Sequence, residues 1–249
     1  MKLFSPKKGR SAIAEDQDGA LSGKAQFVRQ VSHDIKGDFF GVSSVCLLLR
    51  MTLEKKEDPM TMLQHLTEAC DTYKYKLNNF LEYTKFDAGI TDTLPEPVDI
   101  RQLLTGIAEE MRSRAMEKAI RIELTIPDEL PRFIMGDEFR IKHIVENLVV
   151  NALQFSPLGS YVLVKAERKG SDWSITVQDN GEGMTEEQLE SLFVLSPEER
   201  GNLRNPTGLG LIVTRYLVED VLKGKLTIMS RPRVGTQVSV RLPLREAEV

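Results

Sequence analysis

The sequence predicts a chain of two parts, an α-helical hairpin followed by a layered α/β domain. The first part carries two consecutive rows of apolar residues spaced alternately three and four apart, with Pro59 between them. This spacing is typical of helices that pack as a coiled coil. After residue 97 the pattern changes to short strands alternating with amphipathic helices, which indicates helices packed on a sheet. We expect a flexible tail over residues 1–21, the hairpin over 22–92 and the α/β domain over 93–249.

Length and composition favour a soluble globular protein. The chain has 249 residues, of which 41% are hydrophobic and 28% charged, which is ordinary for such proteins. A net charge of −4 argues against a general nucleic-acid binder. No apolar run approaches the roughly 18–20 residues that a membrane span needs. The two cysteines, Cys46 and Cys70, lie on apolar helix faces and lack metal-binding spacing, so we expect a cytoplasmic location.

The hairpin is predicted from the two apolar rows. The first row is apolar except for one acid, and the helix that carries it ends near Glu57; its members are Val28, Val31, Ile35, Asp38, Val42, Val45 and Leu49. The second row follows Pro59, which suits a first helical turn; its members are Leu63, Leu66, Cys70, Tyr73, Leu77 and Phe80. One hairpin cannot bury both rows, whereas two copies can do so in a four-helix bundle. We therefore expect a homodimer, with packing of the hairpin on its own chain as the alternative.

The α/β domain is expected after a linker over residues 87–97, which contains Gly89 and two prolines. Helical periodicity predicts helices over residues 100–118, 137–155 and 208–222. Apolar alternation predicts strands over residues 120–126, 161–167, 173–178, 225–230 and 236–242, the last two as a closing hairpin. Trp173 begins a strand, so we interpret it as a packing residue.

The pair His33-Asp34 is the first candidate site. His33 stands two residues from both Val31 and Ile35, about 200° around the helix from each, so it should point outward. A neighbouring carboxylate can accept a hydrogen bond from one imidazole nitrogen, leaving the other free to attack phosphorus. Taken alone, His33 is better interpreted as an ordinary surface histidine, and the alternative for Asp34 is an acid that solvates the helix.

Asn147 and Asn151 form the second candidate site. They are four residues apart on a predicted helix and therefore share one face. Asparagine is unfavourable inside a helix unless its amide finds a partner. An amide oxygen is a suitable ligand for Mg²⁺ that carries nucleotide phosphates. Capping of nearby loops is the alternative role.

Two glycine-rich segments complete the set. The run Asp179–Gly183 follows a strand, and its glycines permit a tight turn and the close approach of a ligand. The carboxylate of Asp179 is placed to accept the exocyclic amine of adenine, although a plain hairpin turn is the alternative. The run Thr207–Leu211 opens a helix, where backbone amides bind anions. The segment between them, over residues 194–206, contains Arg200 and Arg204, and we interpret it as a lid over phosphates.

In their order, these segments resemble the transmitter core of bacterial sensor histidine kinases. Residues 32–36 resemble the phosphoacceptor box, residues 147–156 the N box, and residues 179–183 and 208–211 the two G boxes, with Phe193 near the F box. The resemblance extends over about residues 22–245. It implies a dimerisation and phosphotransfer hairpin joined to an ATP-binding α/β sandwich of the GHKL type.

The resemblance also implies a role for each matching residue. His33 would be the phosphoacceptor and Asp34 its acid–base partner, Asn151 would hold Mg²⁺ with Asn147 beside it, and Asp179 would bind adenine. The other nucleotide-binding positions would be Phe155, Gly181, Gly183, Arg204, Thr207, Gly208, Leu209, Gly210 and Leu211.

The implied activity is ATP-dependent autophosphorylation of a histidine. The phosphoryl group would pass from His33 to an aspartate on the receiver domain of a response regulator. The implied cofactors are ATP and Mg²⁺, and the implied partners are a second copy of the chain, the response regulator and a separate sensor protein, with no nucleic acid.

The sequence departs from the family pattern at Asp38, where proline is usual, at Gly37, where Thr or Asn is frequent, and at Gln154, where a cation is frequent. These departures motivate an alternative, a non-catalytic dimeric signalling scaffold that binds nucleotide or a response regulator. A GHKL ATPase machine would carry a hydrolytic Glu where Asn147 stands. Glu146 is adjacent but is turned about 100° away from that helix face.

Overall fold

A computed structural model describes residues 37, 39–53, 59–88, 93–192 and 209–247. The predicted residues His33, Asp34, Arg204, Thr207 and Gly208 lie outside these ranges. The chain divides into two compact units, with a boundary between Leu81 and Glu82.

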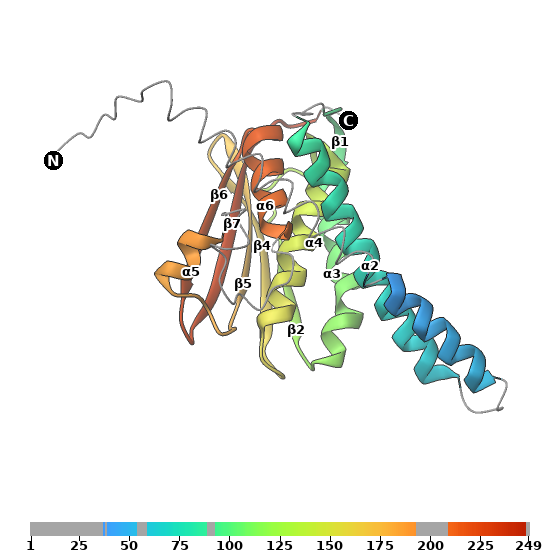
Figure 1. Cartoon of the computed structure of the whole chain (residues 1–249). Helices are drawn as coiled ribbons and strands as arrows, with labels where there is room; N and C mark the ends of the chain where they lie inside the picture. Colours follow the sequence, from blue (N-terminus) through green and yellow to red (C-terminus); the bar gives the residue numbers. More distant parts are fainter. Residues whose placement is uncertain (1–36, 38, 54–58, 89–92, 193–208, 248–249) are drawn as a thin grey trace, which may run out of the picture. The chain divides into compact units, whose positions relative to one another are not determined.

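The first unit contains the two predicted helices (Figure 1). Residues 39–53 are helical, and α2 runs over Met60–Asp87, its last turns belonging to the second unit. The rings of Phe39 and Tyr73 lie 5.9 Å apart, so the helices contact each other. The apolar residues that stay exposed include Phe39, Phe40, Leu47, Leu48, Met51, Leu53, Met60 and Leu63. Cys46 and Cys70 are also exposed, so the single chain leaves part of its apolar helix surface uncovered.

The second unit is built from two sheets and the helices around them. A two-stranded sheet pairs β1 (Glu96–Asp99) with β3 (Phe133–Gly136). The five-stranded sheet has the order β2-β4-β5-β7-β6, with bounds Arg121–Thr125, Tyr161–Lys169, Asp172–Asp179, Gly235–Pro243 and Lys225–Arg231. Only the β2–β4 pair in it is parallel. The helices are α3 (Ile100–Glu117), α4 (Glu138–Phe155), α5 (Glu186–Ser191) and α6 (Leu209–Tyr216).

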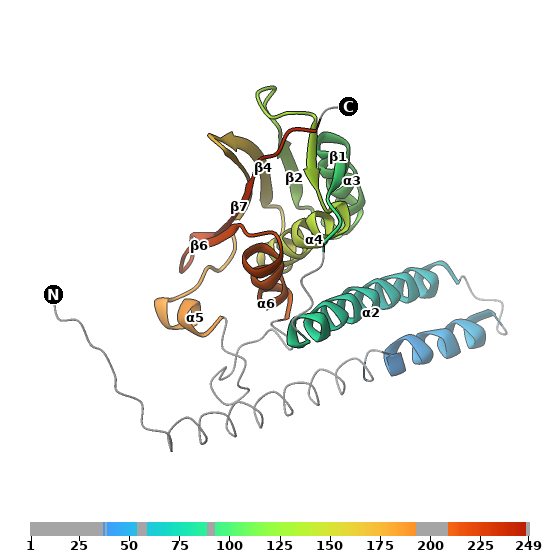
Figure 2. The same cartoon turned by 90° about the horizontal axis from the view of Figure 1, so that it is seen from above.

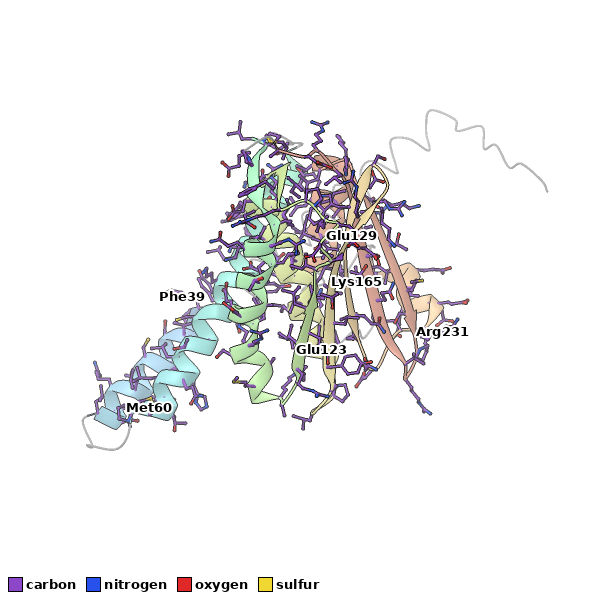
Figure 3. The ribbon with its side chains drawn as sticks, turned by 180° about the vertical axis from the view of Figure 1, so that it is seen from behind. Phe39, Met60, Glu123, Glu129, Lys165 and Arg231 are labelled. Atoms are coloured by element: carbon purple, nitrogen blue, oxygen red, sulfur yellow. The ribbon has the colours of Figure 1, made fainter. Side chains whose placement is uncertain are left out.

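The core lies between the five-stranded sheet and one layer of helices. Figure 2 shows α3, α4 and α6 on the same side of the sheet. Alternation in β4 explains this arrangement, because Val164 and Ala166 are buried toward the helices while Lys165 between them projects from the other face. Figure 3 labels Lys165 of β4 and Glu123 of the adjacent strand β2 on that uncovered face. Trp173 is 2% exposed, which confirms its predicted role in packing. Burying such a side chain contributes about 3 kcal/mol to the free energy of unfolding.

Helix α4 forms where its sequence predicts. Asp137 precedes it, and its carboxylate accepts the backbone N–H of Arg140 at 3.1 Å, a cap that stabilises a helix by about 1 kcal/mol. Its apolar face buries Ile144 and Leu148. The helix ends at Phe155, immediately before a Ser-Pro pair. Its length and orientation are therefore fixed by capping and by one buried face.

Four elements differ from the sequence predictions. The linker expected over residues 87–97 contains the start of β1, whose partner β3 was not predicted either; both strands have only four residues, too few for periodicity to detect. Helix α5 was also missed, although Thr185 and Gln188 form a capping box at its start. The helix predicted over residues 208–222 changes after Tyr216 into a π-helical turn, Leu217–Val221. That wider turn buries three apolar residues: Leu217, Val218 and Val221.

In the part of the chain that the structure describes, no helix is both long and apolar enough to cross a bilayer.

Candidate functional site

Asp179 ends β5 at the rim of the helix-covered face. It is 8% exposed, and its Oδ1 accepts the backbone N–H groups of Gly181 at 2.8 Å and Thr236 at 3.2 Å. Burial raises the pKa of the Asp179 carboxyl, and the two hydrogen bonds offset part of that rise. A buried, oriented carboxylate of this kind can accept a hydrogen bond from a ligand.

Gly181 places the loop after β5 against the end of α4. A Cβ at this position would overlap the backbone oxygen of Phe155 and would approach Asp179 Oδ1 at 2.8 Å. Glycine is therefore required for this approach. The backbone of Phe155, a residue that is 40% exposed, therefore lies against Gly181, so the two predicted positions lie together.

Gly183 places the same loop against the β6–β7 hairpin. Its φ is +63°, and a Cβ would overlap the backbone oxygen of Arg231, the residue that ends β6 and is labelled in Figure 3. The N–H of Arg233 donates to the oxygen of Glu182 at 2.6 Å. A Cβ on Gly235 would in turn overlap the oxygen of Asp179. The loop after β5 is therefore enclosed by α4 on one side and the hairpin on the other.

Asn147 joins α4 to the second glycine-rich segment. It is 1% exposed, and its Nδ2 donates to the oxygen of Gly210 at 3.3 Å and to Thr214 Oγ1 at 3.4 Å. Asn151, one turn further on, is half-buried. Since Phe155 contacts Gly181, helix α4 touches both glycine-rich segments.

The structure thus brings together most of the predicted residues that it describes. Leu209 begins α6, Gly210 is buried and Leu211 is half-buried. The roles predicted for His33, Asp34, Arg204, Thr207 and Gly208 stay predictions. Sequence reasoning missed four contributing residues: Thr214, Ser230, Gly235 and Thr236. The Gly235-Thr236 pair at the start of a predicted strand was the available signal.

Comparison with known proteins adds independent information. Residues 136–246 match the family model described as histidine kinase-, DNA gyrase B- and HSP90-like ATPase. The sensor protein TorS of Escherichia coli K12 is 31% identical over 242 residues, covering 96% of this chain and 26% of that protein. The alginate biosynthesis sensor protein KinB of Pseudomonas aeruginosa is 25% identical over 223 residues, covering 89% of this chain and 37% of that protein. The chain therefore spans about a quarter to two fifths of these relatives.

Solved structures share the fold. The mycobacterial sensor histidine kinase MprB is 26% identical with a TM-score of 0.51, covering 62% of this chain and all of that one. Full-length ShkA in complex with AMPPNP has a TM-score of 0.63 at 22% identity, covering 89% of this chain and 47% of that one. ThkA in complex with the response regulator TrrA has a TM-score of 0.61 at 18% identity, covering 96% of this chain and 68% of that one. Residues 136–246 thus form an ATP-binding domain of the histidine kinase-, DNA gyrase B- and HSP90-like ATPase family, and the chain is the transmitter region of a sensor histidine kinase.

Proposed function

We propose that this chain uses Mg-ATP to phosphorylate His33 and then passes the phosphoryl group to an aspartate of a response regulator. The observation that carries the proposal is the position of α4, which contacts both glycine-rich segments through Asn147 and Phe155. This arrangement lies inside the region that matches the ATPase family.

In this proposal the nucleotide is bound by the two glycine-rich segments, which α4 contacts at its middle through Asn147 and at its end through Phe155. Asp179 accepts the exocyclic amine of adenine through its buried carboxylate. The segment that starts α6 supplies backbone amides to the phosphates. Arg204 and Thr207 are the further residues proposed to bind the phosphates.

Mg²⁺ fits the residue present at position 151. No group of His, Cys, Asp or Glu that could hold a metal occurs among the described residues, so the ion would depend on an amide oxygen and on nucleotide phosphates. Asn151 is half-buried, and its side chain makes no hydrogen bond to another described residue. Magnesium is commonly bound by one or two protein ligands together with phosphates and water. When bound, the ion would neutralise charge on the phosphates.

Transfer requires that the γ-phosphorus be aligned with His33. The imidazole nitrogen forms the N–P bond as the bond to the β,γ-bridging oxygen breaks and ADP leaves. Asp34 holds the other ring nitrogen, which sets the tautomer. Alignment and charge neutralisation supply most of the catalysis in such reactions.

The hairpin is proposed to form a four-helix bundle with a second copy. The large apolar side chains that remain exposed on it support this, among them Phe39 and Met60, labelled in Figure 3. Solved ThkA in complex with TrrA supports a response regulator as partner. A separate sensor protein is the proposed source of input.

The test is incubation of the chain with γ-labelled ATP and Mg²⁺. We expect label on the wild-type protein that is lost in acid and stable in alkali, as phosphohistidine is. The variant His33→Ala should carry no label. The matched control is His65→Ala, which removes an exposed histidine of α2 and should retain full labelling.

The alternative function gives a different result. ATP binding without labelled protein would contradict the kinase proposal and would favour a non-catalytic scaffold. Label that persists in His33→Ala and disappears in His65→Ala would move the acceptor to α2.

A further inference from the structure

Three polar side chains form a row across one end of the five-stranded sheet. Gln178 of β5 pairs with Gln237 of β7, so the next pair along this antiparallel register is Asp179 and Thr236. Thr236 also pairs with Ser230 of β6. Cross-strand partners project on the same face of a sheet. The carboxylate of Asp179 and the two hydroxyls therefore lie in one row on the helix-covered face.

The Ser230 hydroxyl has a partner for every hydrogen-bonding position. Its Oγ accepts the N–H of Met184 at 2.8 Å, donates to the oxygen of Gly235 at 3.1 Å and lies 2.8 Å from Thr236 Oγ1. A hydroxyl has one proton and two acceptor lone pairs. Because the Gly235 carbonyl can only accept, the Ser230 proton is used there. Thr236 must therefore donate its own proton to Ser230.

The consequence is that the row offers only acceptors to a ligand. The Thr236 proton is engaged, so that hydroxyl presents lone pairs. Asp179 uses Oδ1 for two backbone N–H groups, and Oδ2 has no hydrogen-bond partner within the part of the chain that the structure describes. An ionised carboxylate carries no proton.

We propose that Ser230 is a positioning residue that sets the nucleobase preference of the site by holding the Thr236 hydroxyl as an acceptor beside Asp179. The inference rests on the proposed nucleotide-binding function. A 6-amino purine presents a donor to this row, whereas a 6-oxo purine presents an oxygen that two acceptors disfavour. Without Ser230 the Thr236 hydroxyl can rotate and donate to a 6-oxo group.

The experiment compares ATP with inosine triphosphate, which has oxygen at position 6, by titration calorimetry of the full chain. We expect the wild-type protein to prefer ATP. In Ser230→Ala and in Thr236→Val the ATP-to-ITP affinity ratio should fall about tenfold, since a site with a polar mismatch discriminates against the wrong group. The double variant should show no further fall, because Ser230 acts through Thr236.

The control is Ser239→Ala on β7. The Ser239 hydroxyl lies 3.0 Å from Thr176 Oγ1 on the uncovered face of the same sheet. The substitution therefore removes a similar serine–threonine pair that is away from Asp179. The ATP-to-ITP affinity ratio of Ser239→Ala should equal that of the wild type.

An unchanged ratio in Ser230→Ala, with both affinities lowered equally, would show a purely structural role and overturn the inference. Thr236→Val, which keeps the side-chain shape, applies the same test if Ser230→Ala does not fold. If the wild-type chain prefers ATP to ITP and the variants keep that preference, this inference is overturned while the proposed function stands. A wild-type chain that does not bind ATP overturns the proposed function as well.

Discussion

At the residue scale, the stability of the fold and the proposed adenine binding place opposite demands on Asp179. Burial raises the pKa of its carboxyl above the ordinary value. A group whose pKa is raised on folding contributes stability that is fully present below its unfolded-state pKa and is lost as pH rises through its folded-state pKa. At neutral pH the ionised Asp179 therefore lowers the free energy of unfolding, while its charge would serve the proposed binding of adenine.

The substitution Asp179→Asn separates these effects. The amide oxygen can still accept the N–H groups of Gly181 and Thr236, and the buried charge is removed. We expect the unfolding temperature of the nucleotide-free chain at pH 7.5 to rise by about 2–4 °C, corresponding to about 1 kcal/mol. ATP affinity should fall by at least about tenfold, because the site loses a charged acceptor. Thermal unfolding and calorimetric titration measure the two quantities.

The pH dependence of stability tests whether the buried charge of Asp179 causes the destabilisation. The stability difference between Asp179→Asn and wild type should shrink as pH falls through the raised pKa of Asp179, where the wild-type carboxyl becomes neutral. Asp172→Asn, at the other end of β5, is the control and should leave ATP affinity unchanged. A lower unfolding temperature for Asp179→Asn at pH 7.5 would contradict this account.

At the element scale, α4 gives different tasks to two asparagines on one face. Asn147 is buried and donates to Gly210 and Thr214 of α6, which ties the two helices together. Asn151 is half-buried and is the proposed Mg²⁺ ligand. The same residue type at i and i+4 therefore has a structural role at one position and a proposed ligand role at the other.

The pair Asn147→Ala and Asn151→Ala tests this division. Asn147→Ala should lower the free energy of unfolding of the nucleotide-free chain by about 1–3 kcal/mol, because buried acceptors lose their donor. Asn151→Ala should change it by less than about 0.5 kcal/mol but should abolish the dependence of ATP affinity on Mg²⁺. Urea unfolding and ATP titration with Mg²⁺ or EDTA provide the measurements. Equal destabilisation by both substitutions would refute the division.

At the scale of the whole molecule, the hairpin leaves apolar surface exposed while the ATP-binding unit buries its own core. The proposed four-helix bundle would cover that surface. Leu63 belongs to the second apolar row and is 42% exposed in the single chain.

The substitution Leu63→Glu should therefore disrupt the dimer. A carboxylate in an apolar interface costs about 3 kcal/mol or more, which would raise the dissociation constant at least about a hundredfold. Sedimentation equilibrium measures the change. Gln64→Glu adds the same charge at the adjacent exposed position and should leave the dimer intact. A wild-type chain that sediments as a monomer would contradict the proposed bundle.

The sequence by itself determined the long elements and indicated the main parts of the candidate site. Helix α4 could be predicted because its cap, its apolar face and its two asparagines follow local rules. The strands β4 and β5 could be predicted because alternation persists over their eight or nine residues. The glycines after β5 indicated a close approach, although the sequence did not reveal what approaches.

Only the tertiary structure decided which partners these segments meet. The pairing of β1 with β3 joins residues far apart in sequence, and short strands carry little local signal. The contact of Gly183 with Arg231, and the row from Asp179 to Ser230, depend on the strand order of the sheet. Hydrogen bonds between distant residues are set by packing, because periodicity describes a segment's own faces and not the neighbour that covers them.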